Sequence, residues 1–145
     1  MRRSASWLRD MNRALLDESP SVVHFCGHAI EDGIMLLDDN GLSKLVPRQA
    51  LADFLVMFDS LECVLFNACK TAAVAEDTAK AGIPAAIGMK QPIHDPLAIK
   101  FAIAFYDAIF AGKDYKKSFD IACASLALEN GLDALEPVIF EKILF

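Results

Sequence analysis

Two short stretches of this 145-residue sequence end in residues that can carry out nucleophilic chemistry. The stretch VVHFCGHA reads as a strand that ends at Gly27 and His28, and LECVLFNAC reads as a strand that ends at Cys69. In an open α/β sheet, functional residues collect where parallel strands end, at their carboxyl edge. If these strands are neighbours, about 4.8 Å apart, the imidazole and the thiol meet at one edge. The sequence therefore raises the hypothesis of a Cys–His nucleophile pair.

The surroundings of Cys69 favour the same chemistry. Cys69 directly precedes a helix that we expect to begin near Thr71, and a helix N-terminus favours negative charge and therefore a thiolate. The backbone N–H groups of Cys69 and Ala29 are candidate donors to an oxyanion. The residues alone leave a second interpretation open, in which Cys69 is a packed thiol and His28 is a turn residue.

A metal site is the alternative use of the first stretch. His24, Cys26 and His28 alternate along one strand and share one face, and their side chains suit zinc. Same-face neighbours on a strand are about 6.6 Å apart, too far for three ligands to reach one ion. We therefore expect no metal and no cofactor, with His24 as a core histidine and Cys26 as a packed thiol.

Composition excludes several partner classes. The net charge is −6 without a basic cluster after the first turn, which argues against nucleic acid and anionic membrane surfaces. No stretch approaches the roughly 20 apolar residues of a membrane helix. The four cysteines form no CxxC pair, so a reducing, cytoplasmic location is expected. The N-terminal MRRSASWLRDMNRALL reads as an amphipathic helix, with Met11 and Leu15 on its apolar face, rather than as a transit peptide.

The elements that must position these residues alternate along the chain. We expect a helix within 1–16, a buried strand over 19–28, a hairpin over 33–46, a helix over 48–58, a strand over 61–69, a helix over 71–81, a strand over 83–89, and helices over 95–111 and 115–128. Strands that alternate with helices predict a three-layer α/β/α fold with a mainly parallel sheet. We expect one domain over residues 1–145, with few strands for a doubly covered sheet.

Several blocks of the sequence carry a family resemblance. VVHFCGHA, GIMLLDDNG, LECVLFNACKT and GIPAAIGMKQPIHDPLAIKFAIAFYDAIFAGK, in this order, resemble the CHAT family of caspase-like cysteine peptidases, which share a clan with caspases and separase. The likeness is strongest over 22–112 and weaker through GLDALEPVIF. Each block is moderately specific, and their common order makes the signal strong.

The resemblance implies a thiol endopeptidase that cleaves a protein partner. By matching position, His28 corresponds to the catalytic histidine and Cys69 to the nucleophile. Ala29 and Cys69 would supply the oxyanion-hole amides, and Gly27 the tight turn. Such domains commonly act in bacterial signalling or defence, switched on by a sensor protein.

The resemblance also suggests two residues near the pocket for the substrate P1 side chain. Asn67 falls where caspase relatives place a residue that borders this pocket, and Asp95 lies in a loop that approaches it. Each has a plainer interpretation. Asp95 before Pro96 is a well-formed helix N-cap, and Asn67 suits hydrogen bonding in a core or turn.

The sequence departs from the family pattern in three places. Alanine stands at Ala29 where the family usually has glycine, and Thr71 stands where serine or glycine is frequent. The family's opening strand, helix and strand have no counterpart, so the fold is expected to be shortened at its N-terminus. An exposed hydrophobic sheet edge favours pairing with another chain, so a homodimer that completes the sheet is one expected assembly.

The departures support an alternative function, an inactive caspase-like module that acts in oligomerisation or regulation. A small-molecule or nucleotide binder is a third class, but the chain has no GxGxxG motif and no P-loop.

Overall fold

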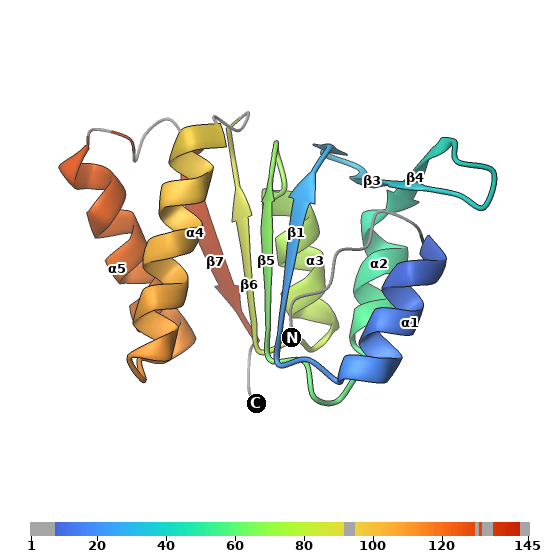
Figure 1. Ribbon diagram of the computed structural model, residues 1–145, viewed down its shortest axis with the longest axis horizontal. Helices are drawn as coiled ribbons and strands as arrows, with labels where there is room; N and C mark the ends of the chain where they lie inside the picture. The colour runs from blue at the N-terminus through green and yellow to red at the C-terminus, as the bar shows by residue number, and fades with distance from the viewer. Residues whose placement is uncertain (1–7, 92–94, 130, 132–134, 143–145) are drawn as a thin grey trace.

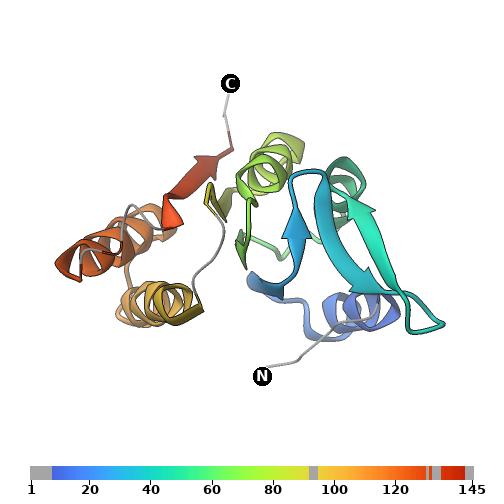
Figure 2. The ribbon, with the colours of Figure 1, turned by 90° about the horizontal axis from the view of Figure 1, so that it is seen from above.

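The chain folds into three layers, a central sheet between two groups of helices (Figures 1 and 2). The computed structural model describes residues 8–91, 95–129, 131 and 135–142, without the side chains of Leu8, Arg9 and Asp95. The sheet has the strand order β1 (Val22–Gly27), β5 (Cys63–Ala68), β6 (Ala85–Met89) and β7 (Pro137–Glu141). The first three strands are parallel and β7 is antiparallel to β6. The predicted α/β/α class with a mainly parallel sheet is therefore confirmed.

The helices divide between the two faces of the sheet. One face is covered by α4 (Asp95–Phe110) and α5 (Tyr115–Leu128), and the other by α1 (Leu8–Glu18), α2 (Arg48–Leu55) and α3 (Ala72–Ala81). A small antiparallel sheet lies beside α2, formed by β2 (Ala29–Ile30), β3 (Gly33–Leu37) and β4 (Ser43–Pro47). Among the described helices, none has the length and apolarity needed to cross a membrane.

The central strands are buried on both sides because helices cover both faces. Every residue of β5 and β6 is buried. In β5, Val64 and Phe66 belong to the core under α1, α2 and α3, whereas Cys63 and Leu65 belong to the core under α4 and α5. This alternation is the two-residue period of a strand, and it places successive β5 side chains on opposite faces.

The predicted helices and the hairpin are confirmed by local structure. Met11 and Leu15 of α1 are buried, as the apolar stripe predicts. The carboxylate of Asp38 accepts hydrogen bonds from the backbone N–H groups of Asn40 and Leu42 in the β3–β4 turn. Gly82 ends α3 with φ +129°, a conformation that favours glycine.

The structure corrects the expectation for the first strand. β1 is an edge strand and not a buried one, because β5 is its one neighbour among the strands of the described ranges. His24 and Cys26 are therefore exposed, and the predictions of a core histidine and a packed thiol are wrong. The sequence analysis did not predict β2 or β7. The strand β2 has two residues, and β7 follows a stretch without a clear strand signal.

Candidate active site

The ends of β1 and β5 form the candidate site. The two strands are neighbours and parallel, and Gly27 is paired with Ala68 at the carboxyl edge. His28 and Cys69 each directly follow this last pair, so the structure brings both strand ends to the same edge. His28 is exposed and Cys69 is partly buried. An imidazole and a thiol are residue types that can serve as a proton shuttle and a nucleophile when they lie at adjacent strand ends.

The turn that carries Cys69 is fixed by Thr71, whose side chain is fully buried. Its Oγ1 lies 2.9 Å from the carbonyl oxygen of Phe66 and 3.0 Å from that of Ala68, and it accepts a hydrogen bond from the backbone N–H of Met89 at 3.0 Å. One hydroxyl therefore joins the end of β5 to the end of β6. The sequence analysis placed Thr71 at the start of a helix and noted it as a departure from the family pattern, but did not predict these hydrogen bonds.

The N-terminus of α3 follows this turn. The first turn of α3 contains no acidic residue, and the hydroxyl of Thr71 does not cap the helix. The helix dipole at this end therefore favours a negative charge close to Cys69 without a competing carboxylate in that turn.

The chain leaves β1 through a turn that requires glycine. Gly27 has φ +137°, and a Cβ built on it would meet no atom within 4 Å, so the constraint is the backbone conformation and not space. His28 then contributes its carbonyl oxygen to a hydrogen bond from the backbone N–H of Met35. Ala29 begins β2 and is paired with Ile34, so this candidate oxyanion donor lies in a strand.

Asn67 is held by the neighbouring helix. Only 6% of its surface is exposed, and its Nδ2 donates a hydrogen bond to the carbonyl oxygen of Ala98 in α4 at 3.0 Å. Its Oδ1 is buried without a hydrogen-bond partner in the described part of the chain. Asp95 is the first residue of α4, but its side chain lies outside the described structure. The structure thus ties Asn67 to the first turn of α4, and the position of the Asp95 side chain relative to it lies outside the described residues.

The other three thiols differ in exposure and acidity. Burial, with a smaller contribution from Glu62, raises the pKa of the Cys63 thiol to about 12. Burial followed by the charge of Asp120 raises the pKa of Cys123 to about 11. Both groups are therefore neutral and poorly nucleophilic at neutral pH, whereas Cys26 is exposed at the sheet edge. Cys26 is therefore a suitable reference thiol when the reactivity of Cys69 is measured.

The metal hypothesis has no support in the arrangement of the possible ligands. Within the described ranges, no three His, Cys, Asp or Glu side chains are grouped as the ligands of one ion. His24 instead lies against the ring of Tyr106 in α4, with 5.8 Å between the ring centroids.

Comparison with protein families identifies the domain. The family model of the CHAT domain matches residues 3–128, which is well over half of the chain. This range includes His28, Cys69 and three of the four strands of the central sheet. A search of curated proteins finds no match to the chain. CHAT domains are caspase-like and related to proteases, as the resemblance of the motifs implied. The chain belongs to the CHAT domain family.

Proposed function

We propose that this chain is a cysteine endopeptidase that uses Cys69 as nucleophile and His28 as general base and acid. The observation that supports it most directly is the pairing of Gly27 with Ala68, because it places the two residues at adjacent strand ends. Membership of a protease-related family supports the same chemistry.

In the proposed reaction, His28 takes the thiol proton and the sulfur of Cys69 attacks the carbonyl carbon of the substrate peptide bond. The backbone N–H groups of Cys69 and Ala29 stabilise the oxyanion of the tetrahedral intermediate. The C–N bond then breaks, and His28 transfers its proton to the leaving amine. Water hydrolyses the thioester and releases the acid, which regenerates the thiol.

We also propose that the substrate is a protein, that a sensor protein activates the peptidase, and that the peptidase acts as a bacterial signalling or defence effector. Asn67 and Asp95 are the residues proposed near the P1 pocket. The four free cysteines support a reducing, cytoplasmic location.

Labelling with peptide acyloxymethyl ketones tests the proposal, since these electrophiles react with an activated thiol. Mass spectrometry after labelling identifies which cysteine is modified, and we expect Cys69 to react at least tenfold faster than Cys26. His28→Ala should slow the reaction at Cys69 by about 100-fold, because general base catalysis contributes about 10²–10⁴-fold.

The matched variant is Cys26→Ala, which removes the exposed comparison thiol and should leave the Cys69 rate unchanged. Equal rates at Cys26 and Cys69, a Cys69 rate that does not depend on His28, or no labelling of any thiol would contradict the proposed peptidase.

The edge position of β1 favours a second candidate function, self-association. β1 carries no charged residue and no proline, the two features that most often protect sheet edges. We propose that a second copy of this chain pairs along β1. If the chain is catalytically inactive, this assembly is the basis of its regulatory role.

A further inference from the structure

A hollow of about 600 Å³ lies beside the turn that carries Cys69. Lys70, the residue after Cys69, lines it together with the first two turns of α3, the end of β6 and two residues inside β7. Glu31 of the β2–β3 turn, which closely follows His28, also lines the hollow. A peptide bound between the two strand ends would therefore have this hollow next to its scissile bond.

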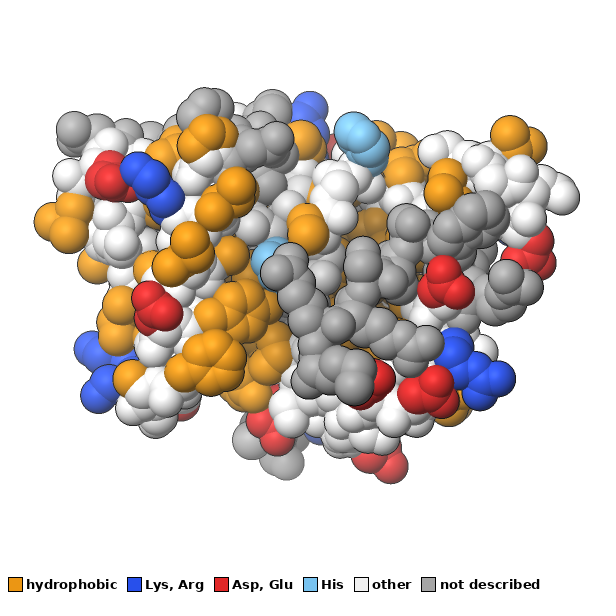
Figure 3. All heavy atoms as spheres, in the orientation of Figure 1, with side chains coloured by type: hydrophobic (Ala, Val, Ile, Leu, Met, Phe, Trp, Pro, Cys, Tyr) orange, Lys and Arg blue, Asp and Glu red, His pale blue; other side chains and the backbone are white. Residues whose placement is uncertain are grey.

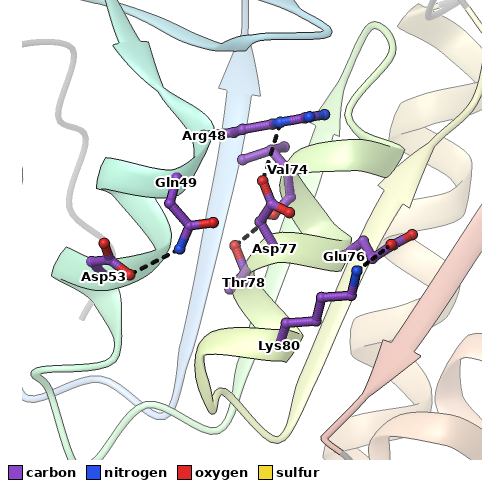
Figure 4. Close-up of polar contacts among 8 residues, drawn as sticks. All are labelled: Arg48, Gln49, Asp53, Val74, Glu76, Asp77, Thr78 and Lys80. Atoms are coloured by element: carbon purple, nitrogen blue, oxygen red, sulfur yellow. Dashed lines mark hydrogen bonds and ion pairs between the residues drawn. The ribbon is translucent and has the colours of Figure 1, made fainter.

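The free charge in the hollow is mainly positive. Four charged residues line it, Lys70, Lys90, Glu31 and Glu76. Glu76 is engaged by Lys80, whose Nζ lies 2.8 Å from the carboxylate (Figure 4). The hydrogen bond from Lys80 lowers the pKa of Glu76, as expected for a committed carboxylate. Neither Lys70 nor Lys90 forms an ion pair with any side chain in the described part of the chain. Among the described residues, the lining charges without an ion pair are thus two ammonium groups and one carboxylate, that of Glu31.

The backbone holds the two lysines in place. Lys70 adopts a left-handed conformation with φ +51°, and its N–H points to the carbonyl oxygen of Gln91 at 3.5 Å. The N–H of Lys90 donates to the carbonyl oxygen of Glu136 at 3.1 Å. The two lysines therefore follow the ends of the neighbouring strands β5 and β6, close to the first turn of α3, which contains no acidic residue. Each of these features favours an anion.

Apolar side chains also line the hollow. Val138 and Phe140 of β7 are partly buried there, and Ala72 and Ala73 of α3 line it as well. Apolar side chains together with two ammonium groups suit a ligand side chain with methylene groups and a terminal carboxylate.

The hollow is separate from the region of Asn67. Asn67 hydrogen bonds to α4, on one side of the sheet, whereas the hollow is lined by α3 on the other side. Successive side chains of an extended peptide point to opposite sides. A substrate whose P1 side chain lies on the α4 side would therefore direct an adjacent side chain into the hollow.

We propose that this hollow is a specificity site for an acidic side chain, aspartate or glutamate, next to the scissile bond of the peptide substrate. Lys70 and Lys90 are the residues that select it. This inference rests on the proposed peptidase function, because it places the substrate at Cys69 and His28.

Internally quenched peptides that differ at one position test the site. Each position around the scissile bond is occupied in turn by Glu, Gln or Lys, and kcat/KM is measured for each peptide. We expect the wild-type protein to prefer Glu over Gln by about tenfold at one position adjacent to the scissile bond, since a charged hydrogen bond contributes about that factor. In the double variant Lys70→Glu/Lys90→Glu this preference should disappear, and the Lys peptide should be cleaved faster than the Glu peptide.

A matched double variant controls for net charge. Lys113→Glu/Lys117→Glu makes the same charge change at exposed positions around the start of α5, away from the hollow, and should keep the wild-type preference for Glu. Equal cleavage of the three peptides by the wild-type protein would overturn the inference. An equal loss on all three peptides in Lys70→Glu/Lys90→Glu would also overturn it.

Binding to the Cys69→Ser variant separates the two proposals. Fluorescence anisotropy with the same labelled peptides measures affinity without cleavage. Selective binding of the Glu peptide that is lost in Lys70→Glu/Lys90→Glu, with no cleavage by the wild-type protein, would retain the acidic site and refute the peptidase. Cleavage by the wild-type protein without any preference for Glu, in kcat/KM or in affinity, would retain the peptidase and refute the acidic site.

Discussion

At the scale of single residues, Thr71 stands out near the candidate site because its buried hydroxyl contacts three backbone groups. Its hydroxyl is the hydrogen-bond acceptor for the backbone N–H of Met89, a fully buried residue. In Thr71→Val this N–H loses its partner, so we expect the free energy of unfolding to fall by about 1–3 kcal/mol. Urea unfolding followed by circular dichroism measures the change.

Thr78→Val is the matched control for this prediction. Thr78 is also fully buried, but its hydroxyl donates to the carbonyl oxygen of Val74 one helical turn earlier, so its removal leaves no N–H unpartnered. We expect this variant to lose less than about half as much stability. Equal losses in the two variants would mean that the bond to Met89 is not what stabilises the turn.

The raised pKa of Cys63 predicts a loss of stability at alkaline pH. Its folded-state pKa is about 12 against an ordinary value of 9.0, so the folded protein keeps the thiol protonated where the unfolded chain ionises. The stabilising effect is complete below pH 9 and decreases as the pH rises towards 12. Between pH 8 and pH 10 this one group should reduce the free energy of unfolding by about 1.4 kcal/mol.

Urea unfolding at pH 8, 9 and 10 under reducing conditions measures this effect. Cys63→Ala removes the titrating thiol, so the difference in stability between the wild-type protein and the variant should narrow by that amount across the range. The comparison also cancels the contributions of Cys123 and Tyr115, whose pKa values are raised as well. A difference that stays constant with pH would show that the Cys63 environment does not control the titration.

The sequence predicts the positions of some of these residues but not the contacts of others. His28 and Cys69 follow from the rule that parallel strands end at one edge, and their strands are indeed neighbours. The role of Thr71 depends on contacts with β6, 18 residues later in the chain, which no local pattern reveals. The burial of Asn67 likewise depends on where α4 packs.

At the scale of elements, periodicity predicted the long helices and the central strands because each has a continuous apolar pattern. β5 and β6 are wholly buried, which matches their nearly unbroken apolar sequences. β1 has a similar sequence but an edge position, since an apolar run does not reveal how many neighbours a strand has. β7 contains five residues, four of which are only partly buried, and its pattern is too short to be distinguished from a loop.

The contact between β6 and the start of α3 leaves no space for a side chain at Gly88. A Cβ on Gly88 would lie 2.5 Å from the carbonyl oxygen of Thr71, so the strand and the turn approach more closely than any other residue type permits. This glycine has an ordinary backbone conformation, and its requirement is therefore steric. The end of β6 thus returns to the turn before α3 and meets it at Thr71, the residue that fixes the turn carrying Cys69.

At the scale of the whole molecule, a row of aromatic rings on α4 begins beside β1. The ring of His24 contacts that of Tyr106 in α4, and Tyr106 stacks on Phe110, which is 84% exposed. Hydrophobic side chains gather over α4 in the surface view (Figure 3). Surfaces of this kind on soluble domains commonly mark interaction sites. The net charge of −6 disfavours self-association in general, but β1 itself contains no charged residue, so two copies can meet there without close like charges.

We therefore expect the protein to dimerise through antiparallel pairing of β1 with its own copy about a two-fold axis. Sedimentation velocity at 1–100 μM, concentrations chosen to span weak and strong association (about −8 to −5 kcal/mol), measures the oligomeric state. Cys26→Lys places a charge at the exposed edge of each copy and should shift the protein to the monomer, because like charges on paired strands repel. Cys26→Ser keeps the edge neutral and should leave the dimer intact. A wild-type monomer throughout this range, or a dimer that persists in Cys26→Lys, would show that β1 is not the interface.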